Sequence, residues 1–319
     1  MNELPTPPRE HRLPGRFVLG TRGSPLALAQ AHELAGRLAQ AHGWSTDELP
    51  LDVIRTTGDA IQNRALSEAG GKGLFTKEID LAQLAGMVDF AVHSAKDLPT
   101  ALPDGLVLAG FLPREDVRDT LIARGATSLA DLRPGAVVGS ASLRRQAILR
   151  RARPDLEIVL LRGNVARRLE KIDGGALDAT MLALAGLKRL GLADRASAIL
   201  SVEECLPAVG QGAIGIVVRA DAPDAAAALA PILCRDTGHA VGAERAFLTE
   251  LDGSCRTPIA GHATVSGDRL HLRGLVLSPD GREIAEGERH GSVTEAAQLG
   301  ADLGRELRRR APAGVYAPA

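Results

Sequence analysis

The chain has 319 residues, of which 45% are hydrophobic and 24% charged, and its formal net charge at pH 7 is -1. A near-neutral chain lacks the positive excess typical of nucleic-acid-binding proteins, and its aromatic residues, which could stack on bases, amount to 2%. Three widely spaced cysteines indicate neither a disulfide framework nor a paired-cysteine zinc site. Residues 1–20 contain no apolar core of signal-peptide length, and no later segment is apolar enough to span a bilayer. We therefore expect a soluble cytoplasmic protein.

Residues 17–112 alternate strand and helix patterns. A short strand at 17–20 precedes a helix that has Ser24 as N-cap and Pro25 at its first position, and that ends near residues 42–43. Further elements are predicted as strands at 51–54 and 89–93 and a helix at about 76–85. The glycine-rich run at 70–73 indicates a mobile loop over residues 58–73.

A second series of strands and helices fills residues 118–206, with apolar strands predicted at 136–139, 156–161 and 179–184. The 156–161 strand is predicted to be buried. Residues 206–212 indicate a crossing between lobes, and 213–218 a strand that rejoins the first sheet. Residues 222–230 form a helix or a linker. The pattern then changes to a helix at 239–251, strands at 263–265, 269–277 and 283–288, and a helix at 294–310.

These patterns predict an α/β fold with two doubly wound lobes resembling type II periplasmic-binding-protein lobes, plus a small C-terminal α+β domain. Domain 1 is discontinuous and comprises residues 1–112 and 213–230. Domain 2 spans 118–206 and carries an arginine-rich cleft face. Domain 3 spans 231–319, and the turn Ser278-Pro279-Asp280-Gly281 within it favours a hairpin.

Nine arginines and no lysine lie between Arg133 and Arg168. Arg144 and Arg145 follow the predicted helix N-cap Ser142, so two cations occupy the first turn of a helix. Because that end of a helix is already partly positive, each charge there is unfavourable by roughly 0.3–1 kcal/mol when exposed. We therefore expect a bound anion to offset them, and their replacement to change stability little.

Two neighbouring strand ends repeat this pattern, with Arg162 after one and Arg189 after the other. Ligands of open α/β sheets bind beyond the carboxyl ends of the strands, where helix N-termini also point. The planar fork of arginine binds two oxygens of a carboxylate or phosphate at once. We therefore expect a polyanionic ligand. A solvated surface is the ordinary explanation for the neighbouring arginines Arg150, Arg151 and Arg153.

Two further residues are candidates for chemistry. Asp97 lies four residues beyond His93, after a predicted strand, and is either a turn aspartate that caps backbone amides or a group that transfers protons. Cys255 lies in a loop beside Arg256, which could lower the pKa of the thiol, although a single cysteine is more often inert. Spacing alone does not decide either case.

Eight motifs in register over about residues 17–310 make the chain resemble the porphobilinogen deaminase, or hydroxymethylbilane synthase, family. They are Thr21-Arg22-Gly23-Ser24-Pro25-Leu26-Ala27, Gly70-Gly71-Lys72-Gly73-Leu74-Phe75, His93-Ser94-Ala95-Lys96-Asp97-Leu98-Pro99, Ser142-Leu143-Arg144-Arg145-Gln146, Leu161-Arg162-Gly163-Asn164-Val165, Ala185-Gly186-Leu187-Lys188-Arg189-Leu190, Leu206-Pro207-Ala208-Val209-Gly210-Gln211-Gly212, and Ala243-Glu244-Arg245 through Cys255. Ser254 stands where many relatives have glycine, and Gly23 where glutamine is common.

The resemblance implies a transferase of tetrapyrrole, porphyrin and heme biosynthesis. It would join four porphobilinogen molecules head to tail, release ammonia at each step, and free hydroxymethylbilane by hydrolysis. A dipyrromethane primer would be thioether-linked to Cys255, with Asp97 as the catalytic acid and no metal. Cofactor contacts are implied for Lys96, Ser142, Arg144, Arg145, Arg168 and Arg189, and substrate contacts for Arg22, Ser24, Arg162, Lys72 and Phe75.

The resemblance also implies a monomer with no nucleic-acid or membrane partner. Two other functions are compatible with the arginine cleft. A two-lobed binding protein for polycarboxylates would share the lobes and lack a covalent adduct. A nucleic-acid binder would place the arginines on phosphates and show a strongly salt-dependent affinity.

Overall fold

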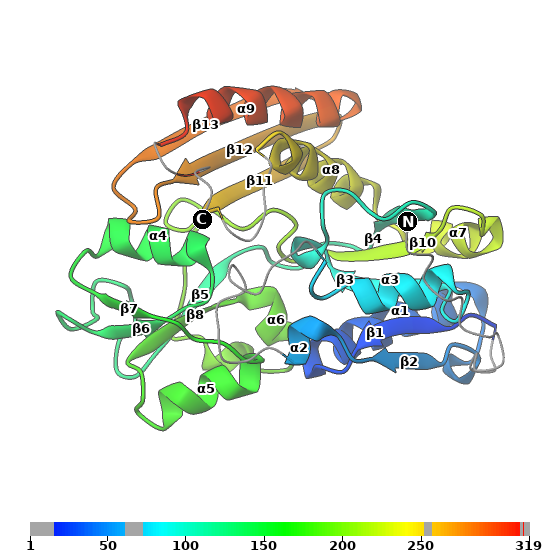
Figure 1. Cartoon of the computed structure of the whole chain (residues 1–319), viewed down its shortest axis with the longest axis horizontal. Coiled ribbons are helices and arrows are strands. Elements are labelled where there is room, and N and C mark those ends of the chain that lie inside the picture. Colours follow the sequence, from blue (N-terminus) through cyan, green and yellow to red (C-terminus); the bar gives the residue numbers. More distant parts are fainter. Residues whose placement is uncertain (1–15, 61–72, 252–256, 313–314, 316–319) are drawn as a thin grey trace, which may run out of the picture. The chain divides into compact units, whose positions relative to one another are not determined.

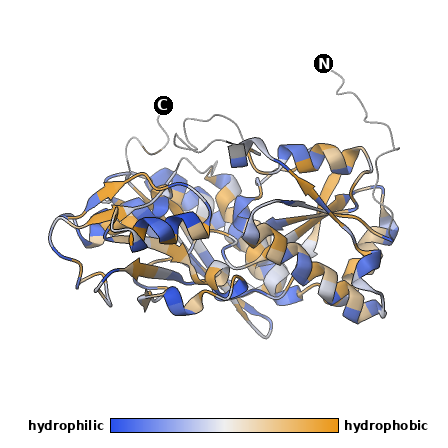
Figure 2. Cartoon of the chain, turned by 90° about the horizontal axis from the view of Figure 1, so that it is seen from below, coloured by the Kyte–Doolittle hydropathy of each residue, from blue (hydrophilic) through white to orange (hydrophobic). Residues whose placement is uncertain are grey.

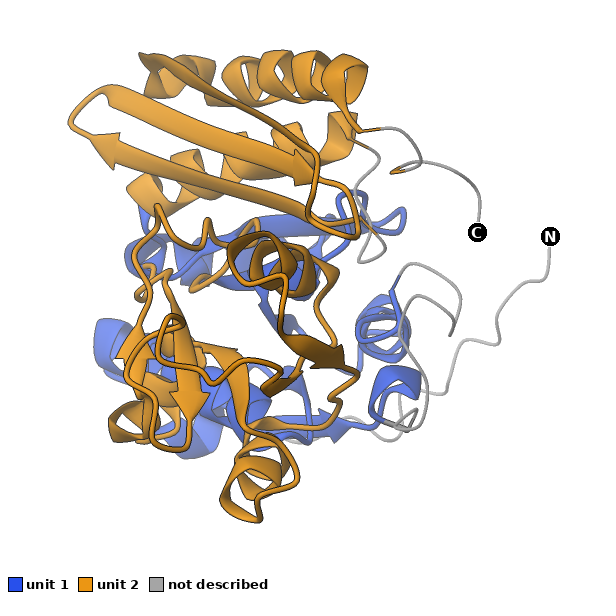
Figure 3. Ribbon diagram, turned by 90° about the vertical axis from the view of Figure 1, so that its left-hand side faces the viewer, with its two compact units in different colours: residues 1–61, 71–113, 214–234 blue, residues 62–70, 114–213, 235–319 orange. Residues whose placement is uncertain are grey.

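The computed structural model describes residues 16–60, 73–251, 257–312 and 315. The chain divides into two compact units (Figure 3). Unit 1 comprises Met1–Ile61, Gly71–Pro113 and Ile214–Cys234, and unit 2 comprises Gln62–Gly70, Arg114–Ala213 and Arg235–Ala319. No helix in these described ranges has the length and apolar character needed to cross a membrane. The division into three domains remains a prediction.

Unit 1 is built on a five-stranded sheet with the order β2-β1-β3-β10-β4. Its strands are β1 (Leu19–Arg22), β2 (Leu51–Ile54), β3 (Phe90–Ser94), β4 (Leu106–Phe111) and β10 (Ile214–Arg219). Strand β1 pairs in parallel with β2 and β3, whereas β10 is antiparallel to both β3 and β4. The predicted return of the 213–218 strand to the first sheet is therefore confirmed.

Three longer helices accompany this sheet: α1 (Pro25–His42), α3 (Lys77–Leu84) and α7 (Pro223–Leu229). Helix α1 starts as predicted, because Ser24 accepts a hydrogen bond from the Ala27 amide. Pro25 is tolerated at the first position, because a backbone N–H there would have no partner within the helix. It ends at Gly43, whose φ of 68° closes the helix in the left-handed region. Leu34 and Leu38 on α1 pack with Phe90 in the unit-1 core. Hydrophobic residues are frequent in the sheet strands (Figure 2).

Unit 2 contains a second five-stranded sheet, with the order β7-β6-β8-β5-β9. Its strands are β5 (Asp119–Ala123), β6 (Val137–Gly139), β7 (Glu157–Val159), β8 (Ala179–Ala183) and β9 (Ala198–Ile199), and its main helices are α4 (Leu143–Ala152), α5 (Val165–Asp173) and α6 (Leu184–Arg189). The expectation of a buried strand at 156–161 was wrong. That segment yields the short edge strand β7, in which Glu157 faces solvent, and Leu160, which follows the strand, is 49% exposed.

The rest of unit 2 is an antiparallel sheet in the order β11-β12-β13, with two helices (Figure 1). The elements are α8 (Arg235–Glu250), β11 (Ile259–Ser266), β12 (Arg269–Leu277), β13 (Ile284–Ser292) and α9 (Ala296–Arg310). The two helices pack so closely that a Cβ added at Gly300 would lie 2.1 Å from the Ala243 carbonyl oxygen. Glycine at this position permits the close approach. Phe247 and Leu303 fill the core between the helices and the sheet.

The β12–β13 hairpin turn lies against α4. Arg150 donates a hydrogen bond of 2.8 Å to the Pro279 carbonyl oxygen. Gly281 has a φ of 75°, and a Cβ there would lie 2.3 Å from the Ala147 carbonyl oxygen. Glycine is therefore required for both the turn and the close approach.

Candidate active site

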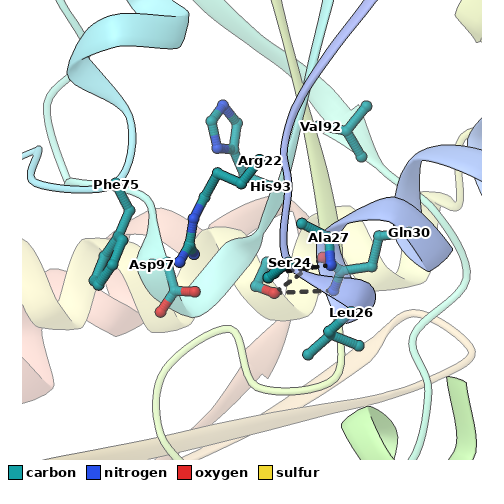
Figure 4. Close-up of a pocket in the computed structure, with 10 residues that line it drawn as sticks. Arg22, Ser24, Leu26, Ala27, Gln30, Phe75, Val92, His93 and Asp97 are labelled. Atoms are coloured by element: carbon teal, nitrogen blue, oxygen red, sulfur yellow. Dashed lines mark hydrogen bonds between the residues drawn. The ribbon is translucent and has the colours of Figure 1, made fainter. Parts of the chain in front are cut away.

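A pocket in unit 1 lies beyond the carboxyl ends of β1 and β3, beside the N-terminus of α1 (Figure 4). Arg22 ends β1, Ser24 caps α1, Phe75 precedes α3, and Asp97 ends the 3-10 turn η3 (Ala95–Asp97). The remaining lining residues are Leu26, Ala27, Gln30, Val92, His93 and Ser94. Four residues predicted from three motifs, Arg22, Ser24, Phe75 and Asp97, thus line one pocket.

Arg22 is held in place by two neighbours. Its Nη2 lies 2.5 Å from Asp59 Oδ1 and its Nε 3.1 Å from Asp59 Oδ2, which gives a two-point ion pair. Its guanidinium carbon is 4.2 Å from the centroid of the Phe75 ring. Burial raises the pKa of Asp59, but the hydrogen bonds and charge of Arg22 outweigh burial and hold that pKa below its ordinary value. Arg22 is thereby oriented before any ligand binds.

His93 lines the pocket and is only 4% exposed. Burial, with a smaller contribution from the charge of Arg22, lowers the pKa of His93 to about 4. Its Nε2 atom is buried and has no hydrogen-bond partner among the described residues. The neutral imidazole is therefore the form that the folded protein holds near pH 7.

We expect His93 to make the fold acid-sensitive. The ordinary pKa of 6.5 applies to the unfolded chain, so between pH 6.5 and 4 the unfolded state gains a proton that the folded state refuses. The stability that depends on a neutral His93 is fully present above pH 6.5. As the pH falls from 6.5 to 4, the free energy of unfolding decreases by about 3 kcal/mol in all. Denaturant unfolding of wild type, His93→Gln and the exposed control His32→Gln measures it. An equally steep pH dependence in His93→Gln contradicts the assignment.

In unit 2, Arg144 and Arg145 converge on one carboxylate. Arg144 Nη2 lies 2.6 Å from Asp119 Oδ2, and Arg145 Nη2 lies 2.5 Å from Asp119 Oδ1. Arg144 is 4% exposed, Arg145 6% and Asp119 0%. Burial raises the pKa of Asp119, but the two arginine charges outweigh it and hold that pKa well below its usual range. The anion that offsets the two helix-terminal arginines is therefore part of the chain.

Two more residues complete this cluster. Gln211 Nε2 donates to Asp119 Oδ1 at 3.1 Å and to the Val117 carbonyl oxygen at 2.7 Å. The Cys205 sulfur lies 3.2 Å from Asp119 Oδ2. Burial and the nearby carboxylate raise the pKa of the Cys205 thiol to about 12, despite the opposing charge of Arg144. The Cys205 thiol therefore stays protonated and unreactive near neutral pH.

This arrangement corrects the expectation that Arg144 can be replaced at little cost in stability. Arg144→Leu leaves the buried Asp119 with one arginine, and breaking a buried ion pair typically costs about 3–5 kcal/mol. We expect a loss of that size in the free energy of unfolding, measured by denaturant titration. The matched control is Arg282→Leu, because the Arg282 side chain is 87% exposed. A change as small as that of Arg282→Leu rules out the structural role.

The other predicted residues of unit 2 lie near helix ends. Ser142 caps α4 by accepting a hydrogen bond from the Arg145 amide. Arg168 Nε donates to the Gly163 carbonyl oxygen at 2.9 Å, and Arg189 Nη2 donates to the Gly212 carbonyl oxygen at 3.1 Å. Arg162 is partly buried, which lowers its pKa.

In unit 1, Lys96 precedes Asp97 in η3. Lys72, most of the loop expected at 58–73, and Cys255 with its 252–256 segment lie outside the described residues.

Sequence reasoning missed the acidic partners of the arginines. Asp59 and Asp119 lie outside the eight motifs, 37 residues from Arg22 and 25 from Arg144, so spacing could not pair them. It also missed the role of Glu244, which is 0% exposed and accepts from both Nη atoms of Arg114, at 2.6 and 3.1 Å. The sequence signal that could have revealed this role is the position of Glu244, an acidic residue within an apolar helix pattern.

The fold and pocket define an α/β protein with a charged site at strand ends. The chain belongs to the porphobilinogen deaminase family. A model of the porphobilinogen deaminase dipyrromethane cofactor binding domain matches residues 17–227, and one of the porphobilinogen deaminase C-terminal domain matches residues 239–309.

Curated relatives agree with the family models. The chain is 58% identical over 294 residues to a porphobilinogen deaminase of Nitrobacter hamburgensis, covering 92% of this chain and 93% of the relative. It is 52% identical over 316 residues to one of Paracoccus denitrificans, covering 99% of each.

Solved structures resemble the chain more distantly. A periplasmic binding protein from Salmonella typhimurium aligns with a TM-score of 0.38 and 14% identity, covering 68% of this chain and 92% of that one. A TRAP periplasmic solute binding protein from Desulfovibrio salexigens aligns with a TM-score of 0.41 and 10% identity, covering 68% and 72%. These low scores do not bear on function, and the fold class rests on the sheet orders given above.

Proposed function

We propose that the chain condenses four porphobilinogen molecules head to tail, with release of ammonia, on a covalent dipyrromethane primer, and frees hydroxymethylbilane by hydrolysis. The observation that carries this proposal is membership of the porphobilinogen deaminase family, including the match to its cofactor binding domain over residues 17–227. The activity is that of a transferase in porphyrin and tetrapyrrole biosynthesis.

The residues present fit a dipyrromethane that bears carboxylate side chains. Arginine forks are the preferred partners of carboxylates, and the Nε of Arg144 is a buried donor with no partner among the described residues. The proposed cofactor contacts are Lys96, Ser142, Arg144, Arg145, Arg168 and Arg189, with a thioether to Cys255. Asp119 then acts as a positioning residue, because it fixes two of these arginines from behind.

Porphobilinogen is the proposed ligand of the unit-1 pocket. Its carboxylates would pair with Arg22, which Asp59 and Phe75 already orient. Ser24 lines the same pocket at the N-terminus of α1, where partial positive charge favours an anion. Arg162, Lys72 and Phe75 complete the proposed substrate contacts.

Asp97 is the proposed catalytic residue. Each condensation breaks the bond between the substrate methylene and its amino nitrogen and forms one carbon–carbon bond. The bound primer supplies the nucleophilic pyrrole carbon for that bond. The Asp97 carboxylate stabilises the positive charge that develops on the substrate as ammonia leaves, and it accepts the proton that the attacking pyrrole carbon of the primer releases after the new bond has formed. Attachment through Cys255 makes each extension effectively intramolecular.

The proposal includes a cytoplasmic monomer that binds neither nucleic acid nor membrane. The near-neutral net charge of -1 supports the absence of a nucleic-acid partner, because it provides no bulk attraction to phosphates. Sedimentation of the purified chain tests the oligomeric state.

Incubation of the purified chain with porphobilinogen tests the function. We expect four ammonia molecules for each hydroxymethylbilane formed. The alternative, a two-lobed binding protein for polycarboxylates, would bind porphobilinogen and leave it unchanged. Recovery of intact porphobilinogen from a folded protein carrying its primer would therefore contradict the proposed function.

A further inference from the structure

Three side chains of types that can bind a metal gather on the C-terminal sheet, and none of them has a role in the proposed function. His271 on β12 lies directly opposite His290 on β13 in the antiparallel register, and Glu288 lies two residues before His290. Within the described residues, the possible ligand atoms of these three side chains all lie within 4.8 Å of one another. One turn-linked pair of strands thus supplies two imidazoles and a carboxylate.

The geometry within this cluster is ordered. The two imidazole rings stack with centroids 4.0 Å apart and planes inclined by 6°. Nε2 of His271 is 3.0 Å from Glu288 Oε2, and Nε2 of His290 is 3.7 Å from Glu288 Oε1. Both rings therefore direct a nitrogen toward the same carboxylate, as ligands of a shared ion do.

The cluster faces away from the helices. Alternate residues of β12, Leu270 and Leu272, are buried in the core that α8 and α9 cover. Because side chains alternate along a strand, His271 projects from the opposite face. The side chains of His271, Glu288 and His290 are 35%, 59% and 56% exposed, so an ion and its remaining water ligands can reach them.

We propose that His271, Glu288 and His290 form a binding site for a divalent transition-metal ion, with Zn²⁺ the ion best suited. Two imidazoles and one carboxylate with an open fourth position are a common zinc ligand set, with ligand distances of about 2.0–2.2 Å. Mg²⁺ and Ca²⁺ bind imidazole nitrogens poorly, because both ions prefer oxygen ligands. The sequence pattern did not indicate the site, because His271 lies on another strand, 17 residues before Glu288, and meets the other two ligands only through the strand register.

A metal at this site would join β12 to β13. Because an ion that binds the folded form alone stabilises it by mass action, Zn²⁺ would raise the melting temperature of the C-terminal sheet. The site uses no residue proposed for porphobilinogen or its primer, so turnover does not require it.

Calorimetric titration of the metal-free full-length protein with zinc chloride tests the proposal. We expect one site that binds Zn²⁺, and binding weaker by about tenfold or more in His290→Ala and in Glu288→Gln. The control is His32→Ala, which removes an exposed histidine on α1. Magnesium chloride should give no binding at this site.

A second measurement follows the stability of the same variants. Zn²⁺ should raise the melting temperature of wild type and of His32→Ala, and at the same zinc concentration it should raise those of His290→Ala and Glu288→Gln by clearly less. Normal turnover without zinc shows that each variant is folded. Equal zinc affinity in wild type and both variants, or no binding in wild type, overturns the proposal.

Discussion

Replacing Cys255 by serine is expected to yield a folded protein that carries no covalent dipyrromethane and has almost no turnover. A serine hydroxyl has nearly the shape of the thiol, but its much higher pKa leaves it a poor nucleophile without an adjacent base. Without a covalent anchor, each extension also loses its intramolecular character. Turnover with porphobilinogen, together with peptide mapping of residues around 255, measures both effects.

The control for this experiment is Cys234→Ser, which changes a partly exposed free cysteine. It should retain both the adduct and turnover. Cys205 is a weaker candidate for attachment, since its buried thiol has a pKa of about 12. Wild-type turnover in Cys255→Ser, or an adduct mapped to another residue, contradicts the assignment of the anchor.

Asp97→Asn is expected to turn over at least ~100-fold more slowly than wild type while binding porphobilinogen about as well. Asparagine keeps the shape of the side chain and removes its charge, so the variant loses stabilisation of a cation that exists only during the reaction. A factor of this size is typical for the loss of one well-placed electrostatic or acid–base group. Asp97 lines the same pocket as Arg22, which keeps the substrate contact in place.

Single-turnover release of ammonia separates chemistry from binding. The measurement uses Asp97→Asn protein whose mass confirms that it carries the primer. The matched control is Asp104→Asn, which changes an exposed aspartate in a nearby loop. Ammonia release at the wild-type rate in Asp97→Asn means that Asp97 is a turn residue and that another pocket group is the acid.

Local sequence signals predicted the elements that position the site. The cap at Ser24, the proline at position 25 and the glycine at position 43 fixed the limits of α1, because each meets a specific backbone requirement. The Ser142 cap likewise located Arg144 and Arg145 in the first turn of α4. Motifs that resemble one family then indicated Arg22, Phe75 and Asp97 as site residues, and these three residues line one pocket.

Long-range pairing could not be predicted in the same way. Asp119 lies 25 residues from Arg144, and only the packing of β5 against α4 brings the carboxylate to the guanidinium. The run at 156–161 has the composition of a buried strand, but its place at the sheet edge depends on the strand order. Both cases are decided by tertiary contacts, which neither spacing nor composition encodes.

The intact mass of the purified wild-type protein tests most directly whether the chain builds its product on a covalent primer. We expect the mass of the polypeptide plus two pyrrole units. A brief exposure to limiting porphobilinogen should add a ladder of single-pyrrole increments to that species, and Cys255→Ser should show neither the primer nor the ladder. An active wild-type enzyme with the mass of the bare polypeptide would contradict the proposed function.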